Sequence, residues 1–342
     1  MGPGAVAAVN EEAQTLFDAK PGREITRGAS PASVESGKFS GFRQAGVGRV
    51  SRGVRSLRDD ALKMLGREHS AGQAIQALET ARSLFPRISF DLIYARPSQS
   101  DADWENELST ALDLVADHLS LYQLTIEPGT KFEALHRRGE LTLPDADDAA
   151  RLYDLTSETA ARHGLLPYEV SNYARPGAES RHNLTYWRYA DYIGIGPGAH
   201  GRLTLDDGLY ATRRHRAPEP WAERVEQTGS GSTDETALSP EEKGREALLM
   251  GLRLSEGINE TRFAHRTGRA LEDCVDPFML EACLEENYLM REGGLLHAPP
   301  EGCLRLDSLL ARLVPLGHAQ PLINRTRPCA DPFSLPSLLP AP

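Results

Sequence analysis

Residues 181–201 concentrate the side chains most able to do chemistry. The stretch holds two histidines, His182 and His200, together with four aromatic residues and closely spaced glycines. Aromatic rings that carry a polar tip, set beside an imidazole, suit a flat and partly apolar ligand. Glycines let the backbone pass close to such a ligand or to a neighbouring strand. The stretch therefore indicates a binding site for a flat ligand.

Two other interpretations of this stretch stay open from its residues alone. Gly196-x-Gly198-x-x-Gly201 matches a dinucleotide fingerprint, which requires a strand before it and a helix after it. Residues 202–212 instead predict a strand, a turn and a second strand, so this context argues against a nucleotide loop. The other alternative is an aromatic core hairpin in which His182 is only hydrogen-bonded, since aromatic residues dominate protein cores.

Composition excludes several classes of protein. The chain has 342 residues and a net charge of -11, which disfavours a nucleic-acid groove or contact with an anionic membrane surface. No apolar run is long enough to span a membrane, and the first residues lack the pattern of a signal peptide. We therefore expect a cytoplasmic protein with no nucleic-acid partner and no membrane span.

The cysteines do not have the spacing of a metal site. Cys274, Cys283, Cys303 and Cys329 are widely separated, and none belongs to a C-x-x-C pair. Zinc and iron–sulfur sites are usually built on closely spaced cysteines. The four residues are expected to be buried thiols that bind no metal.

The pattern of elements predicts an α/β fold. Strands are expected near residues 24–26, 49–54, 88–94 and 119–126, and helices near residues 33–45, 71–85, 101–115 and 145–165. A capping box of Ser70 and Gln73 marks the start of one helix. Strands that alternate with helices at this spacing favour a parallel sheet or barrel.

The later part of the chain predicts a second domain. Residues 168–173 have the pattern of one more strand, and residues 228–238 resemble a linker because they are rich in Gly, Ser and Thr. Residues 239–313 predict a helical domain that starts at a capping box and has a short β-wing near residues 295–306. The proline-rich tail, residues 314–342, is expected to be disordered.

Several longer motifs identify a family. They are residues 65–70 (Leu-Gly-Arg-Glu-His-Ser), 121–130 (Leu-Tyr-Gln-Leu-Thr-Ile-Glu-Pro-Gly-Thr), 174–177 (Ala-Arg-Pro-Gly), 181–187 (Arg-His-Asn-Leu-Thr-Tyr-Trp), 192–200 (Tyr-Ile-Gly-Ile-Gly-Pro-Gly-Ala-His) and 210–213 (Tyr-Ala-Thr-Arg). From about residue 25 to about residue 313, the chain closely resembles the haem chaperone (HemW) branch of the oxygen-independent coproporphyrinogen III oxidase family, within the radical SAM superfamily.

The resemblance implies a fold, cofactors and a ligand site. The fold would be a partial (β/α)6 barrel over residues 1–227, followed by a winged-helix-like α+β domain. Members of the family bind S-adenosylmethionine and a [4Fe–4S] cluster, and the chaperone branch binds haem. Haem binding is associated with the H-N-x-x-Y-W motif, which here corresponds to His182, Asn183, Tyr186 and Trp187.

The sequence departs from the family at the cluster. The C-x-x-x-C-x-x-C motif does not occur in these 342 residues, and in the family it lies before the region where this chain begins. We therefore expect a chain that is truncated at its N-terminus and cannot hold the cluster. The strand near residues 24–26 would then be an open barrel edge, which predicts aggregation or an oligomer formed through that edge.

Other departures affect the positions that would contact S-adenosylmethionine. The family's glutamate in its E-x-N-P segment corresponds to Gly28, and its glutamine in G-V-Q-S corresponds to Arg55. The G-L-P-G-Q turn is Ala-Arg-Pro-Ser-Gln at residues 95–99, and Ser180 replaces a cysteine. Arg67 and Asp91 match positions that contact S-adenosylmethionine, although an ion pair in the barrel interior is an equal alternative for them.

Three functions follow as hypotheses. The first is a haem chaperone that has lost radical chemistry and passes haem to a haem-receiving apoprotein. The second is a coproporphyrinogen oxidase-like radical SAM enzyme, which would need cluster ligands from outside this sequence. The third is a non-catalytic interaction module that uses the open edge of the barrel.

Overall fold

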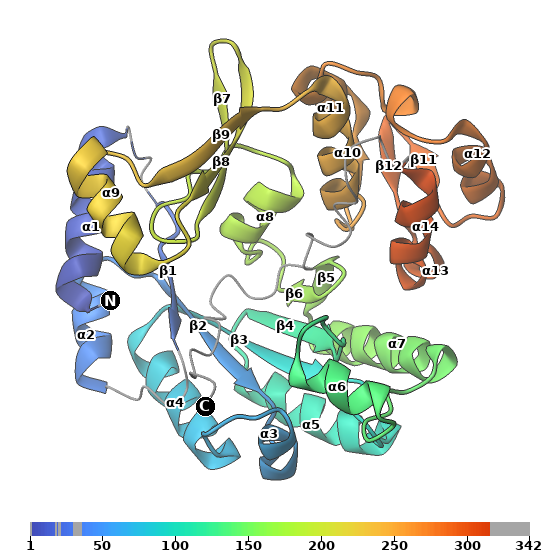
Figure 1. Ribbon diagram of the computed structural model, residues 1–342. Helices are drawn as coiled ribbons and strands as arrows, with labels where there is room; N and C mark the ends of the chain where they lie inside the picture. Colours follow the sequence, from blue (N-terminus) through green and yellow to red (C-terminus); the bar gives the residue numbers. More distant parts are fainter. Residues whose placement is uncertain (1, 18, 20–21, 30–35, 315–342) are drawn as a thin grey trace. The chain divides into compact units, whose positions relative to one another are not determined.

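The computed structural model describes residues 2–17, 19, 22–29 and 36–314 (Figure 1). These residues form two compact units. The first contains residues 2–167 and 171–179, and the second contains residues 168–170 and 180–314. The division falls just before the H-N-x-x-Y-W segment and so comes earlier than the boundary at residue 227 that the sequence suggests. The tail expected to be disordered lies outside the described residues, apart from Val314.

Within the described residues, the largest sheet has six strands in the order β1-β2-β3-β4-β6-β5. The strands are β1 (Thr26–Ala29), β2 (Arg49–Arg55), β3 (Arg87–Tyr94), β4 (His118–Gln123), β5 (Leu166–Glu169) and β6 (Asn172–Ala174). Strands β1 to β4 run parallel, whereas β6 runs antiparallel to β4. The predicted α/β fold is confirmed. β1 lies at one edge of this sheet, as expected for the first strand of an open barrel.

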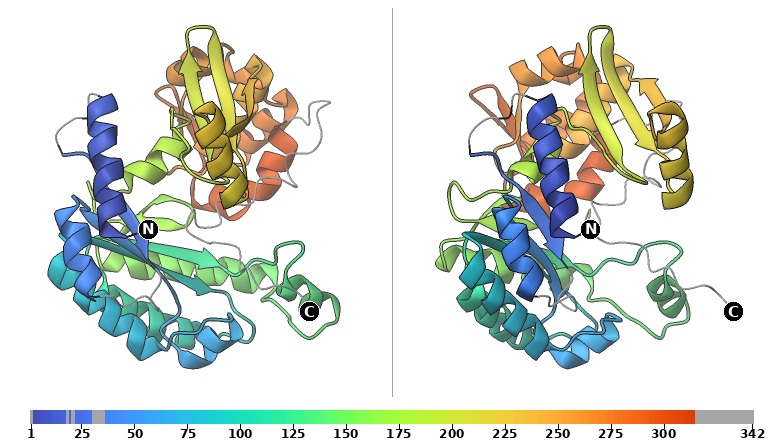
Figure 2. Two further views of the ribbon diagram at one scale, coloured as in Figure 1. Left: turned by 60° about the vertical axis from the view of Figure 1, so that its left-hand side comes forward. Right: turned by 90° about the vertical axis from the view of Figure 1, so that its left-hand side faces the viewer.

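The helices of the first unit alternate with these strands. They are α1 (Pro3–Leu16), α2 (Ser36–Gln44), α3 (Asp59–Met64), α4 (Ala71–Leu84), α5 (Asp101–Leu114), α6 (Lys131–Arg137) and α7 (Ala146–Arg162). Figure 2 shows α4, α5 and α7 along one face of the sheet. The capping box predicted at Ser70 and Gln73 is present, and it satisfies backbone N–H groups at the first turn of α4.

The core of the first unit joins α5 to the sheet through one tryptophan. The Trp104 ring is fully buried and stacks on Tyr94 with ring centroids 4.9 Å apart. Its indole N–H donates a hydrogen bond of 2.8 Å to Thr156 of α7. Because the ring is both packed and hydrogen-bonded, it fixes β3, α5 and α7 to one another.

In the turn after β3, Ala95 and Ser98 stand at the positions where the family's turn has glycine. Ala95 and Ser98 adopt φ angles of 55° and 59°, a left-handed region that favours glycine. Between them, the buried Arg96 side chain forms an ion pair with Glu107 of α5, and Glu107 also accepts a hydrogen bond of 2.8 Å from the Leu57 backbone N–H. This buried ion pair holds a turn whose residue types disfavour its backbone conformation.

Two elements of the sequence prediction are corrected. Residues 168–173, predicted as one strand, are the end of β5 and the start of β6, with a turn between them. The predicted linker at residues 228–238 is largely strand β9 (Ser232–Ala237), which pairs with the preceding strand in an antiparallel ladder. A composition rich in Ser and Thr is compatible with an edge strand whose side chains are mostly exposed.

The second unit contains two small sheets and several helices. One sheet has the order β7-β8-β9, with β7 (His200–Leu205) and β8 (Gly208–Arg214). The other has the order β10-β12-β11, with β10 (Ile258–Asn259), β11 (Met290–Glu292) and β12 (Leu295–His297). The helices are α8 (Arg181–Trp187), α9 (Pro218–Thr228), α10 (Pro240–Gly251), α11 (Glu260–Thr267), the 3-10 helix η1 (Leu271–Cys274), α12 (Pro277–Glu285), α13 (Pro300–Leu304) and α14 (Leu306–Leu313).

The C-terminal part of this unit agrees with the prediction except at the wing. The capping box at Ser239 and Glu242 begins α10, and a buried cluster around Leu248, Leu296 and Leu310 forms the core. The hairpin of the wing spans residues 290–297. The wing was predicted to continue to residue 306, but residues 300–304 form α13 instead. Pro300 favours this helical start because proline fits the first helical position.

Candidate functional site

The H-N-x-x-Y-W motif forms helix α8. Ser180 is the N-cap, and its hydroxyl accepts a hydrogen bond of 3.3 Å from the Asn183 backbone N–H. Serine is among the preferred residues at this position because its oxygen satisfies an N–H group that the helix leaves unpaired. The replacement of the family's cysteine by Ser180 is therefore compatible with the local fold. The aromatic core hairpin considered from the sequence is wrong for this segment, because residues 181–187 are helical.

Three rings form a ladder on α8 and the loop that follows it. His182 and Tyr186 are one helical turn apart, with centroids 4.7 Å apart in an edge-to-face arrangement. Tyr186 in turn lies against Tyr192, with centroids 4.4 Å apart. His182 is exposed, whereas Tyr186 and Tyr192 are partly buried. The ladder thus presents an imidazole to solvent on a support of two tyrosines.

Tyr192 was not among the site residues predicted from the sequence. Its spacing from Tyr186 fits no helical repeat, and only the turn after α8 brings the two rings together. The loop is fixed by Tyr189, whose hydroxyl donates a hydrogen bond of 2.6 Å to Glu246, and by an antiparallel bridge between Tyr192 and Arg202. The high aromatic content of residues 181–201 was the signal that could have pointed to Tyr192.

The other two motif residues face the protein. The Asn183 side-chain amide donates a hydrogen bond of 3.1 Å to the Tyr168 hydroxyl. Trp187 is 8% exposed, and the guanidinium of Arg253 lies over its ring at 5.3 Å. Among the described residues, the Trp187 indole nitrogen has no hydrogen-bond partner. Asn183 and Trp187 therefore anchor α8, whereas His182 and Tyr186 form its outer part.

The space around Trp187 is too small for a flat macrocycle. Trp187 and Phe263 help to line a cavity of about 30 Å³. Ligand pockets usually measure roughly 300–1,000 Å³. A large ligand at α8 would therefore have to bind on the exposed side, next to His182. Ile193 and Ile195, which follow Tyr192 in the chain, are 44% and 73% exposed.

The glycines after the ladder serve the backbone. A Cβ atom at Gly194 would lie 2.1 Å from the carbonyl oxygen of His200, and one at Gly201 would lie 2.6 Å from the Thr212 hydroxyl. The loop can therefore pack against β7 and β8 only with glycine at these positions. Strand β7 begins at His200 and contains Gly201, so the segment that a dinucleotide fingerprint requires to be helical is a strand.

Asp91 and Arg67 lie in different surroundings in the first unit. Asp91, on β3, forms an ion pair with Arg55 of β2, with an N–O distance of 2.8 Å, and each side chain is 10% exposed. Arg67 is exposed and follows α3. The ion pair considered for Asp91 is therefore present, but its partner is Arg55, the residue that replaces the family's glutamine.

Arg55 makes this pair from an unusual backbone conformation. Its φ angle is 71°, at a register shift in the pairing of β2 with β3. Left-handed backbone is unfavourable for a residue with a side chain, at about 1–2 kcal/mol. The charge pairing with Asp91 helps to offset this strain.

A buried histidine on β4 contacts β3 and is held neutral by its surroundings. The ring Nδ1 of His118 lies 2.7 Å from the Ser89 hydroxyl, and the side chain is fully buried. Burial, with Arg49 and Arg87 nearby, lowers the pKa of His118 to about 3. His118 therefore carries no charge at neutral pH.

The donors of the described residues do not fit an iron–sulfur cluster. Cys274 and Cys283 are buried and Cys303 is partly buried, and burial raises the pKa of each thiol. Within the part of the chain that the structure describes, no three His, Cys, Asp or Glu residues group as metal ligands would. Cys329 lies outside that part.

No helix in the same part of the chain is long and apolar enough to cross a membrane.

Comparisons with known proteins agree with this architecture. Residues 238–305 match the HemN C-terminal domain. The solved structure of coproporphyrinogen III oxidase (HemN) from Escherichia coli, a radical SAM enzyme, superposes with a TM-score of 0.71 at 16% identity, covering 91% of this chain and 74% of that one. The class is therefore that of α/β proteins with the HemN radical SAM fold, a partial barrel with a C-terminal domain.

Relatives in sequence define the family more narrowly. The chain is 35% identical to the heme chaperone HemW of Escherichia coli, covering 87% of this chain and 78% of that protein. It is 37% identical to the mitochondrial radical S-adenosyl methionine domain-containing protein 1 of Bos taurus, covering 91% and 72%. The chain belongs to the HemW and HemN family of radical SAM proteins.

Proposed function

We propose that this chain binds haem at α8 and passes it on, as a haem chaperone, without radical chemistry of its own. The observation that carries the proposal is the ring ladder, in which an exposed imidazole rests on Tyr186 and Tyr192. Support comes from the identity to proteins named heme chaperone HemW in Escherichia coli and Bacillus subtilis, at 35% and 34%.

The residues of α8 fit haem in different roles. Haem supplies an iron centre that can accept a nitrogen ligand. His182 offers an exposed imidazole for this purpose, and Tyr186 offers a ring against which a porphyrin can lie. Asn183 and Trp187 position the helix through Tyr168 and Arg253. An exposed site suits a carrier, because a haem-receiving apoprotein needs access to the ligand.

Two features of the chain support the absence of radical chemistry. The cysteines of this sequence lack the C-x-x-x-C-x-x-C spacing, so a cluster would need cysteines from outside these 342 residues. Asp91, which matches a cofactor-contacting position, is already paired with Arg55. A carboxylate held in a buried ion pair is less able to bind a ligand, because the pair must first be broken.

A haem titration tests the proposal. Haem is added to the wild-type chain and to His182→Ala, and the Soret band is followed. We expect the variant to lose at least tenfold in affinity and to change the position of the band, because the iron loses a ligand. His265→Ala is a matched control, because His265 is also an exposed histidine on a helix of the second unit. Identical spectra and affinities for wild type and His182→Ala would remove His182 as the ligand.

The radical SAM oxidase is the second candidate, and the fold of HemN supports it. Anaerobic reconstitution with iron and sulfide separates the two candidates. We expect no four-iron signal and no reductive cleavage of S-adenosylmethionine. A cluster that cleaves S-adenosylmethionine would favour the oxidase.

The cytoplasmic location remains a prediction, since the name of the Bos taurus relative includes the word mitochondrial.

A further inference from the structure

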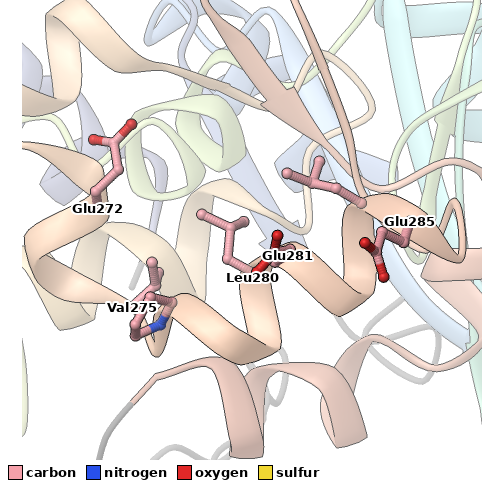
Figure 3. Close-up of a pocket in the computed structure, with 7 residues that line it drawn as sticks. Glu272, Val275, Leu280, Glu281 and Glu285 are labelled. Carbon is pink, nitrogen blue, oxygen red and sulfur yellow. The ribbon is translucent and has the colours of Figure 1, made fainter.

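A shallow groove lies beside α12 in the second unit (Figure 3). Its volume is about 300 Å³. Its lining residues are apolar or acidic, namely Val275, Pro277, Leu280, Leu284, Glu272, Glu281 and Glu285. Val275 and Leu280 belong to the buried core, whereas the glutamates are exposed. The groove therefore combines an apolar floor with an acidic rim.

The three glutamates differ in how their charge is used. Glu272 pairs with Arg291, and the hydrogen bond from this guanidinium lowers the pKa of the Glu272 carboxyl. Among the described residues, Glu281 and Glu285 have no ion-pair partner. They are four residues apart on α12, so their side chains lie on the same face, one helical turn apart. The rim thus presents two uncompensated negative charges with a regular spacing.

α12 also carries an exposed aromatic ring. Phe278 is 81% exposed, a high value for a large apolar side chain. Phe278 follows Pro277, which lines the groove, and exposed apolar patches are typical of surfaces that bind another protein. A phenylalanine so exposed contributes little to the core.

We propose that this groove binds a basic amphipathic segment of another protein. An apolar side chain of the segment enters between Val275, Leu280 and Leu284. Two lysine or arginine side chains, one helical turn apart, pair with Glu281 and Glu285. Charge complementarity selects this occupant, because the acidic rim repels nucleic acid and anionic lipid, whereas a neutral peptide leaves both carboxylates unpaired. The proposal does not depend on haem binding at α8.

A labelled model peptide tests the proposal on the full chain. The probe is a fluorescent helical peptide of leucine and lysine, with lysines four residues apart, and a peptide with glutamate in place of lysine is its control. Binding is measured by fluorescence anisotropy. We expect saturable binding of the basic peptide alone, and about tenfold weaker binding to Glu281→Lys/Glu285→Lys. Phe278→Ser, a change at an exposed position, is expected to weaken binding about threefold.

A second charge reversal separates the groove from general electrostatic attraction. Glu223→Lys/Glu226→Lys changes two exposed glutamates of α9 and shifts the net charge equally. This variant is expected to bind the basic peptide as the wild type does. Equal loss in both double variants would overturn the proposal, since the peptide would then sense only the net charge of -11. A dimer of the chain that Glu281→Lys/Glu285→Lys dissociates, without peptide binding, would also overturn it in favour of a second copy.

Discussion

The family resemblance points to two ligand-binding regions, and their polar side chains differ in exposure. On β2 and β3, Arg55 and Asp91 are turned toward each other and are each 10% exposed. On α8, His182 is exposed and rests on two tyrosine rings. The charged groups of the first region pair with each other, whereas the exposed imidazole of the second can be reached from solvent. Arg55, a departure from the family, lies in the first region, whereas the retained motif lies in the second, directly after the replacement at Ser180.

The largest expected effect is a loss of stability when the buried ion pair of Arg55 with Asp91 is broken. Arg55→Met removes the guanidinium and leaves the Asp91 carboxylate buried without its partner. We expect a loss of about 3–5 kcal/mol in the free energy of unfolding, because an unpaired buried charge is strongly destabilising. Urea denaturation of the wild type and the variant measures this loss.

A double variant separates the loss of the pair from the loss of packing. Arg55→Met/Asp91→Asn contains no buried charge at this point, and it should regain a large part of the stability. If the double variant were as unstable as Arg55→Met, the charge of Asp91 would not be the cause. A small effect of Arg55→Met alone would instead show that the two side chains are better solvated than their 10% exposure indicates.

Local signals in the sequence were sufficient for the alternation of strands and helices in the first unit and for the start of α10 in the second. The strand predicted at residues 88–94 is β3, and the capping boxes at Ser70 and Ser239 begin α4 and α10. Such features depend on neighbouring residues only, so they can be recognised without tertiary contacts. The same holds for the strand, turn and second strand predicted over residues 202–212, which correspond to β7, its turn and β8.

Features that depend on distant residues could not be predicted in the same way. The pairing of β9 with β8 overrides a composition that resembles a linker. The contact of Tyr192 with Tyr186 depends on the turn after α8, and the Arg55–Asp91 pair joins two adjacent strands far apart in sequence. The motif identified His182 and Tyr186, but only the structure separates these outer residues from the anchoring Asn183 and Trp187.

The second prediction concerns the buried histidine of the sheet. The pKa of His118 is lowered to about 3, so the folded chain keeps it neutral while the unfolded chain binds a proton below a pKa of 6.5. Stability should therefore fall as the pH decreases from 6.5 toward 3, by about 1.4 kcal/mol per pH unit from this group. Urea denaturation between pH 6.5 and pH 5 measures the slope. His118→Gln should reduce the slope, whatever its effect on stability at pH 7, and an unchanged slope would contradict the assignment to His118.

The smallest effect is expected on haem affinity at α8, the exposed region. Tyr192→Leu removes the ring that supports Tyr186 at 4.4 Å. An aromatic pair contributes about 0.5–1.5 kcal/mol, which corresponds to a loss of about two- to twelvefold in haem affinity if the ladder positions His182. Tyr192→Phe keeps the ring and should bind haem like the wild type, so a haem titration of the two variants isolates the ring contact from the hydroxyl. If both variants bind haem equally well, the ladder does not position the imidazole, and α8 alone holds His182 in place.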